Sequence, residues 1–439
     1  MLKPVFDHSA PPSVAIGQAA FPAPFDPGLE YAAPARGTWN IVHIGMLIPQ
    51  AHEIFVCAEG CLRGVVLTAA EMGASERFST IAIREENVLD GDMETLIIEG
   101  VSDILGQLPS LPPAVLVYTS CIHHFMGCDL PLVYRTLRER FPNVDFTDCY
   151  MNPIMRKSGL TPDQLMRRQL YSLLKPQPLQ PRAVNLIGNC FATDERSDLI
   201  RCLRAGGWQV RDIAWCRSYA EYQQMAQSSV NISYNPVARA GGEALAERLG
   251  QRHLYLPLSY DPQEIAAHMD ALCDALELPR QDDGPLMEQA EQALAAARRL
   301  IGQMPVAIDY TATTRPLGLA RLLIEHGFAV SRVYADGFLA EERPAFDWLQ
   351  AHAPGLMLLP TVQVGMRVAP RQAGPTLAIG QKAAYFTGTG HFVNIVEGGG
   401  LYGLDGIRRM AELMVEAHLH EKDARSLIQI KGLGCRCCV

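Results

Sequence analysis

Short apolar runs alternate with amphipathic helical patterns along most of this chain, and this alternation limits the possible folds more than any other feature. "HEIFVC" (52–57) and "FSTIAI" (78–83) have the composition of strands, and "PPAVLVYTSC" (112–121) is a buried strand that ends on cysteine. Between them, "DMETLIIEGVSDILGQL" (92–108) carries its apolar residues at helical spacing. Buried strands separated by helices predict a parallel sheet with right-handed crossovers.

The alternation restarts twice, after the proline-rich "LLKPQPLQPR" (173–182) and after the helical connector "LMEQAEQALAAARRLIGQM" (286–304). We therefore expect an α/β fold of three doubly wound, Rossmann-like domains with parallel sheets around a central cleft. We also expect a strand in "WNIVHIGML" (39–47). The predicted parts are an extended N-terminal arm (1–37), a first α/β domain with cluster cysteines (38–175), a second (182–285), a third (286–430) and a cysteine-rich tail (431–439).

Charge and hydropathy exclude several classes of protein. The net charge is −9 and there is no basic block, so we expect no nucleic-acid partner. No stretch approaches the ~18 uninterrupted apolar residues of a membrane span. The N-terminal segment has no apolar core after a basic start, so it lacks the pattern of a secretory signal, and we expect a cytoplasmic protein.

Twelve cysteines are many for a chain in a reducing compartment, where clustered cysteines more often bind metals or act in catalysis than form disulfides. Cys57 and Cys61 lie in "IFVCAEGCLRGV", and Cys121 and Cys128 lie in "TSCIHHFMGCDL". If the two loops converge, Cys57, Cys61 and Cys121 meet the requirements of an iron–sulfur cluster, with Gly60 allowing a close backbone approach. The alternative is a set of buried free thiols. We expect Cys149, Cys202, Cys216 and Cys273 to be ordinary core residues.

Other polar residues have two interpretations each. His123 and His124 follow Cys121, where they either tune a cluster or relay protons, or else form a hydrogen-bonded loop. Arg315 begins a predicted helix and is either a cation near the site or an ordinary ion-pair partner. The C-terminal tail carries three cysteines, which either bind a metal or belong to a chain end without such a role: Cys435, Cys437 and Cys438. Because the chain has no P-loop motif, any ATP hydrolysis requires a separate partner.

Four segments, in order, resemble the nitrogenase component 1 superfamily. The superfamily includes the catalytic chains of nitrogenase, dark-operative protochlorophyllide reductase and the nitrogenase-like reductases. The resemblance covers about residues 38–420 and rests on four stretches: "FVCAEGC" (55–61), "VSDILGQLPSLPPAVLVYTSCIHHFMGCDL" (101–130), "DYTATTRPLGLARLLIEHGFAV" (309–330) and "VEGGGLYGLDGIRRMAELM" (396–414).

The resemblance implies an iron–sulfur cluster, P-cluster-like or 4Fe–4S, at a subunit interface. Cys61 and Cys121 match two of the three cysteines that each chain of the family contributes to it. The family's first cysteine has no counterpart in "YAAPARGTWNIVHIG" (31–45), and Cys57 is the stand-in that we expect. Cys128 replaces a family acidic residue and is a further ligand candidate.

The family's large catalytic cofactor is ligated by a cysteine and a histidine that this chain lacks. Asn235 and Tyr402 stand at the corresponding positions. Three interpretations remain open. The chain is the partner subunit without that cofactor, or its cavity takes an organic substrate directly; the cleft candidates are His123, His124, Arg315 and Tyr402. In the third, other residues hold a larger iron–sulfur cofactor, and Cys190 is the best-placed thiol.

The resemblance predicts a subunit of the catalytic component of a nitrogenase-like two-component reductase. It implies a homologous sister chain, a heterotetramer, an ATP-hydrolysing iron–sulfur reductase and a small-molecule substrate, for which methylthio-alkanes with carbon–sulfur cleavage are our first expectation. A scaffold on which a complex iron–sulfur cofactor is assembled is the alternative. A metal-free sensor of the periplasmic-binding type is a third possibility.

Overall fold

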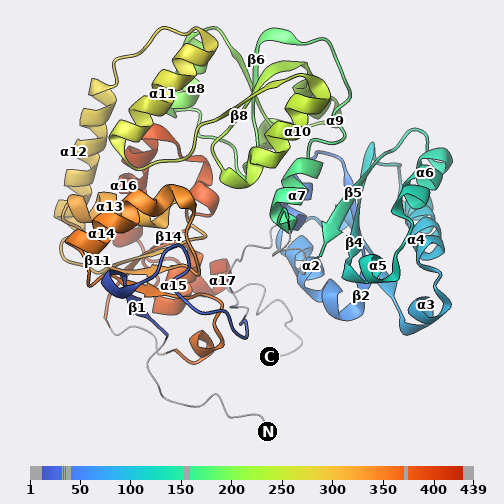
Figure 1. Ribbon diagram of the computed structural model, residues 1–439, viewed down its shortest axis with the longest axis horizontal. Coiled ribbons are helices and arrows are strands. Elements are labelled where there is room, and N and C mark those ends of the chain that lie inside the picture. The colour runs from blue at the N-terminus through green and yellow to red at the C-terminus, as the bar shows by residue number, and fades with distance from the viewer. Residues whose placement is uncertain are drawn as a thin grey trace. The chain divides into compact units, whose positions relative to one another are not determined.

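The computed structural model describes residues 12–31, 33, 35, 41–152, 159–369 and 374–428. The chain forms two compact units, which are described separately (Figure 1). Unit 2 comprises Trp39–Ala192 and Gly207–Leu256, and unit 1 comprises Met1–Thr38, Thr193–Gly206 and Pro257–Val439. Two parts of the range predicted as the second domain (182–285), residues 193–206 and 257–285, thus belong to unit 1. The predicted domain boundaries therefore differ from the boundaries of the two units.

The first sheet of unit 2 is parallel, in the order β3-β2-β4-β5. Its strands are β2 (His52–Ala58), β3 (Phe78–Ile83), β4 (Ala114–Ser120) and β5 (Asp145–Met151). Helix α2 (Glu59–Glu71) lies on one side of this sheet, and α4 (Met93–Gln107) and α6 (Leu130–Arg140) lie on the other (Figure 1). The short helices α3 (Glu85–Asp90) and α5 (Cys121–Met126) belong to its connections. Each face has its own apolar core.

The second sheet of unit 2 is also parallel, in the order β7-β6-β8-β9. Its strands are β6 (Gln180–Leu186), β7 (Gln209–Asp212), β8 (Ser228–Ser233) and β9 (Arg252–Tyr255), and its helices are α9 (Tyr219–Gln224) and α10 (Arg239–Leu249). Helix α7 (Pro162–Gln169) packs against α10 and connects the two sheets. One apolar core runs from the α2 face of the first sheet through α7 to the second sheet, so unit 2 is a single body.

Residues 41–45 form a helix, α1 (Ile41–Gly45), where the sequence predicted a strand. Ile41, Val42 and Ile44 are all buried, and such a short apolar run fits either structure. Contacts with the neighbouring sheet favour the helix. Tyr118 donates its hydroxyl proton to the Ile41 carbonyl oxygen (3.1 Å). At Gly45 the helix comes so close to the sheet that an added Cβ would lie 2.1 Å from a Glu53 carboxyl oxygen. The strand prediction for this segment is therefore wrong.

Gly188, just after β6, gives a test of this packing. Its φ is +84°, and an added Cβ would lie 1.9 Å from the Cβ of Ala238. We expect Gly188→Ala to lower the free energy of unfolding by at least ~2 kcal/mol, since both the backbone and the contact would have to shift. Urea denaturation followed by circular dichroism measures it. Gly64→Ala is the matched control: it meets no atom within 4 Å in α2 and should stabilise by ~0.5 kcal/mol. Equal stability of the Gly188 variant and wild type would contradict this packing.

Unit 1 contains a six-stranded sheet in the order β1-β12-β11-β10-β13-β14. The strands are β1 (Val14–Ala15), β10 (Val306–Asp309), β11 (Val330–Tyr334), β12 (Met357–Leu359), β13 (Leu377–Ile379) and β14 (Phe392–Val393). All pairs are parallel except that β1, from the N-terminal arm, pairs antiparallel with β12. The predicted α/β class with parallel sheets is confirmed.

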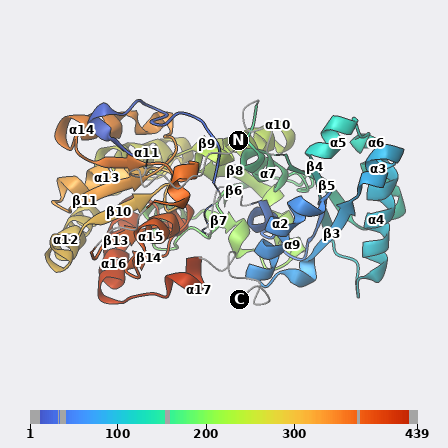
Figure 2. The same ribbon diagram turned by 90° about the horizontal axis from the view of Figure 1, so that it is seen from below.

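The helices of unit 1 cover both faces of this sheet. They are α8 (Asp198–Ala205), α11 (Pro262–Leu276), α12 (Gly284–Ile301), α13 (Pro316–Glu325), α14 (Arg343–His352), α15 (Gln381–Thr387), α16 (Gly403–Leu419) and α17 (Ala424–Ile428). Helices α13 and α14 lie on one side of the strands, and α16, which packs against α12, lies on the other (Figure 2). Within the described residues, no helix combines the length and apolar character that a membrane crossing requires.

Candidate functional site

Three thiols from separate elements of unit 2 lie near one edge of its first sheet. Cys57 is buried near the end of β2, Cys61 is exposed in the first turn of α2, and Cys121 is half-buried as the first residue of α5. Strands β2 and β4 are parallel neighbours, with Val56 paired to Thr119. Their carboxyl ends therefore lie side by side, and the residues that follow them, Cys57 to Cys61 and Cys121, share this edge.

The electrostatics of Cys57 also indicate that the three thiols are close. Burial, followed by the nearby thiols of Cys61 and Cys121, raises the pKa of Cys57 to about 12. Three thiolates at this edge would repel one another without a cation, and metal binding supplies the charge that favours the deprotonated ligands. A positively charged group at this edge would thus stabilise the thiolate form of Cys57.

The donor set fits a polynuclear cluster better than a single metal ion. Among the residues that the structure describes, no group of three or more His, Cys, Asp or Glu side chains is placed to hold one ion. A multi-iron cluster is less demanding, because its thiolates bind different iron atoms and need not converge on one point. Beside Cys61, an added Cβ on Gly60 would meet nothing within 4 Å, so the space there is open and leaves room for the approach to a cluster that the sequence predicts.

Cys128 and the two histidines line a cavity of about 420 Å³ at the carboxyl ends of β4 and β5. His123 is buried and its Nδ1 accepts a hydrogen bond from the Ser120 amide (3.1 Å), while His124 is exposed. Burial, followed by the charge of Glu94, raises the pKa of Cys128 to about 12. Cys128 therefore faces carboxylates on α4 and at Asp129, a setting that disfavours a thiolate ligand.

Cys190 follows β6 in the second sheet and lies beside a buried cation. The Arg167 guanidinium is 1% exposed and its Nη2 donates to the Cys190 sulfur (3.4 Å). Arg167 also donates to the Gly188 carbonyl oxygen and to Asp163 (3.2 Å). The contact between this thiol and a buried guanidinium is one that the sequence did not predict.

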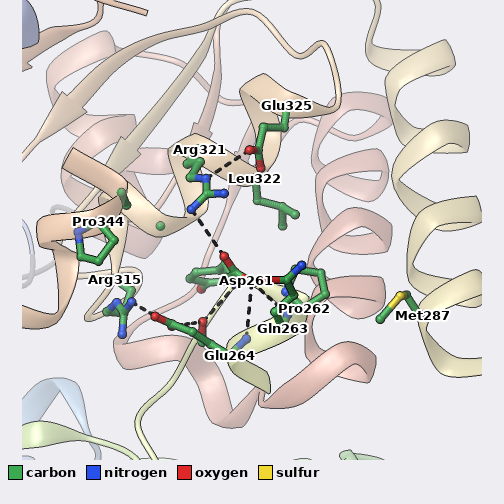
Figure 3. A pocket seen from close by; sticks show the side chains of 14 residues that line it. Asp261, Pro262, Gln263, Glu264, Met287, Arg315, Arg321, Leu322, Glu325 and Pro344 are labelled. Atoms are coloured by element: carbon green, nitrogen blue, oxygen red, sulfur yellow. Dashed lines mark hydrogen bonds and ion pairs between the residues drawn. The ribbon is translucent and has the colours of Figure 1, made fainter. Parts of the chain in front are cut away.

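Arg315 and Tyr402 lie in unit 1. Arg315 is 6% exposed and donates to the Leu258 carbonyl oxygen (3.2 Å) and to Glu264 (3.2 Å). It lines a cavity of about 360 Å³ that also contains Arg321 (Figure 3). Arg321 pairs with Asp261 (3.4 Å) and with Glu325, so each guanidinium seen in Figure 3 already has a carboxylate partner.

Tyr402 is buried and directly precedes α16. Asp198 of α8 accepts hydrogen bonds from the amides of Leu404 (2.5 Å) and Asp405 (3.3 Å), which holds the start of that helix. The turn around Tyr402 is thus fixed by a carboxylate that is distant in sequence. The sequence did not identify Asp198 as a partner of α16, because an acidic residue at the start of its own helix, α8, is also typical of an ordinary helix cap.

The remaining cysteines divide into core residues and residues outside the described parts. Cys149, Cys202 and Cys273 are buried, as expected, and the sulfurs of the last two are 3.8 Å apart; Cys216 is half-buried. The tail cysteines lie outside the described residues: Cys435, Cys437 and Cys438.

A family model described as "Nitrogenase component 1 type Oxidoreductase" matches residues 42–389. The chain belongs to this family. Two solved structures are similar to this component 1 type oxidoreductase. One, titled "Nitrogenase Cp1 at pH 6.5", has 14% identity and a TM-score of 0.64 and covers 90% of this chain and 94% of its own.

The other solved structure, titled "Nitrogenase Cp1 at pH 5", has 11% identity and a TM-score of 0.59 and covers 92% and 94% of the two chains. At these identities the likeness shows the component 1 fold. No curated protein sequence matches the chain. This component 1 type chain is thus an oxidoreductase by family, and the family binds iron–sulfur clusters and works with a reductase partner.

Proposed function

We propose that this chain is a subunit of the catalytic component of a nitrogenase-like two-component reductase. An ATP-hydrolysing iron–sulfur reductase would deliver low-potential electrons, and a homologous sister chain would complete a heterotetramer in the cytoplasm of an anaerobic cell. The proposal rests above all on the placing of Cys57, Cys61 and Cys121 at one edge of the first sheet. Cys61 is exposed, as a ligand to an interfacial group must be.

Cys57, Cys61 and Cys121 are the residues that would hold the cluster, which accepts and releases electrons one at a time when bound. In this proposal, Cys57 replaces the family's first cysteine ligand, which has no counterpart in residues 31–45 of this chain. Its burial keeps water from one side of the group, and the open space beside Gly60 leaves room for the sister chain's ligands. Cys128 is a poorer candidate because its neighbours are carboxylates.

For the substrate we propose a methylthio-alkane. The reaction cleaves one carbon–sulfur bond: ethyl methyl sulfide, two electrons and two protons give methanethiol and ethane. The partner reductase supplies both electrons. Arg315 and Tyr402 remain the cleft candidates, although Arg315 already donates to Glu264 and to a backbone carbonyl oxygen.

The test is turnover by the anaerobically purified complex with its reductase, ATP and ethyl methyl sulfide, with ethane and methanethiol measured by gas chromatography. Iron and acid-labile sulfide are measured on the same samples. Iron with ATP-dependent ethane supports the full proposal. Absence of iron would sink the proposal, and iron without ethane would overturn the substrate class alone.

The second candidate is a scaffold for the assembly of a complex iron–sulfur cofactor. One observation favours it: Asn235 and Tyr402 replace the tight cofactor ligands, and Tyr402 is buried beside the start of α16. A scaffold would transfer its cluster to an acceptor protein and would not sustain substrate reduction. With an apo-acceptor protein added to this assay, transfer of iron to the acceptor without sustained substrate reduction would favour the scaffold.

A further inference from the structure

The cavity beside α5 contains polar atoms that lack partners. It has a volume of about 420 Å³ and lies where β4 and β5 end, bounded by α5, the start of α6 and α7. Ligands of parallel α/β sheets usually bind beyond the carboxyl ends of the strands, and this volume is within the range of small-molecule sites. Its polar lining comes from Ser120, His123, Tyr150, Asn152 and Arg168, among others.

His123 supplies an unused donor. Its Nδ1 lies 3.1 Å from the Ser120 amide nitrogen and 3.4 Å from the Ser120 carbonyl oxygen; the shorter contact, in which the amide donates, favours the tautomer with the ring proton on Nε2. Nε2 is buried and has no hydrogen-bond partner, and His123 is 2% exposed. A buried N–H without an acceptor destabilises the fold, and a ligand oxygen at this position would remove that cost.

Asn152 supplies an unused acceptor in the same cavity. Its side chain is 7% exposed, and its Oδ1 is buried without a hydrogen-bond partner. The neighbouring carboxylate of Asp148 does not compete for a ligand donor, because its oxygens already accept from Gln169 (2.6 Å) and from the Tyr150 hydroxyl. The lining thus presents one fixed donor and one fixed acceptor.

Arg168 adds a positive charge. It is half-buried in α7 and lies close enough to Tyr150 to lower the pKa of that phenol, against the stronger effect of burial. No ion pair joins it to any residue in the described parts of the chain, whereas its neighbour Arg167 binds Asp163. A free guanidinium at the wall of a concave site is suited to bind a carboxylate through two parallel hydrogen bonds.

We infer that this cavity binds a small carboxylate that carries a hydroxyl or amino group on the neighbouring carbon. Arg168 binds the carboxylate, the His123 Nε2–H donates to a ligand oxygen, and the hydroxyl or ammonium donates to the Asn152 Oδ1. The site is separate from the proposed cluster ligands, although Cys121 lies only two residues before His123. Binding of such a ligand does not depend on the reductase function proposed above.

Titration calorimetry on the full chain, purified anaerobically, tests the site with L-malate, L-aspartate and succinate. L-malate should bind with a dissociation constant at or below about 1 mM. Succinate lacks the hydroxyl and should bind about fivefold more weakly. A preference for L-malate over L-aspartate would assign the donor as a hydroxyl, and the reverse would assign it as an ammonium group.

Two variants and one control assign the contacts. Arg168→Gln should weaken L-malate binding at least about tenfold. Asn152→Leu should remove the preference for L-malate over succinate. Arg135→Gln, an exposed arginine of α6 away from the cavity, should change neither affinity by more than about twofold. No saturable binding of L-malate or L-aspartate, or wild-type affinity in Arg168→Gln, would overturn the inference, as would equal binding of succinate and L-malate.

Discussion

Complexes in which Cys61 or Cys121 is replaced with alanine should contain less than about a quarter of the iron of the wild-type complex. Each replacement removes a thiolate from a different element, α2 or α5, and leaves an iron atom of an interfacial cluster without its protein ligand. The remaining thiols cannot move to compensate, because Cys57 is 1% exposed within β2. Iron and acid-labile sulfide per chain, together with the paramagnetic-resonance signal of the reduced protein, measure the effect.

Cys57→Ala decides whether this thiol is the stand-in for the missing ligand. If it is, iron should fall as in the other two variants. Cys149→Ala is the matched control, since Cys149 is a buried cysteine on β5 of the same sheet and its replacement removes the same side-chain atom. Retained iron in Cys57→Ala would restrict the ligands to Cys61 and Cys121, and equal iron loss in Cys149→Ala would show a folding defect.

Glu342→Gln should remove a pH dependence from the stability of unit 1. Burial raises the pKa of Glu342 to about 8 from an ordinary value of 4.5, against the opposing effect of the Gly318 amide. Between pH 4.5 and 8 the unfolded chain releases a proton that the folded chain keeps. The free energy of unfolding therefore falls by ~1.4 kcal/mol per pH unit, or about 5 kcal/mol across this window. Below pH 4.5 and above pH 8, this group contributes no slope.

The glutamine variant keeps the geometry while it abolishes the titration. Its side-chain oxygen accepts the same hydrogen bonds from the amides of Leu317 (2.7 Å) and Gly318 (3.0 Å) at the start of α13. Urea denaturation from pH 5 to pH 8 should show a smaller slope than in wild type, and the variant should be the more stable protein at pH 8. Glu341→Gln, at the half-buried neighbour in the same turn, is the control. Parallel pH profiles of wild type and Glu342→Gln would contradict the assignment.

Local sequence patterns were sufficient to predict the class of fold, but they did not predict which distant segments are in contact. The alternation of strands and helices predicted the parallel sheets, because period and burial are properties of short stretches. The 41–45 segment was ambiguous for the same reason, since a short apolar run has no resolvable period. The proximity of Cys57, Cys61 and Cys121 depends on the register of β2 against β4. The family resemblance suggested that these cysteines lie together, and the residues alone did not.

The polar contacts that the sequence did not predict join residues across long separations. Arg315 meets Glu264 from 51 residues away, and Asp198 meets Leu404 from 206 residues away. The cavity of His123 and Arg168 likewise combines residues of α5 and α7. No periodicity relates such pairs, because their proximity follows from how helices cover the sheets and from which charges must find partners once buried.

The pairing of β1 with β12 has a consequence for synthesis on the ribosome. Val14 meets Leu358, so the first strand is made about 340 residues before its partner. At roughly 5–20 residues per second, it remains without a partner for about 20 to 70 seconds. The first sheet of unit 2, which is complete by Met151, can form during that interval. The N-terminal arm is therefore made first but cannot pair until β12 has been made, and resistance of residues 12–30 to a protease would report that synthesis has passed β12.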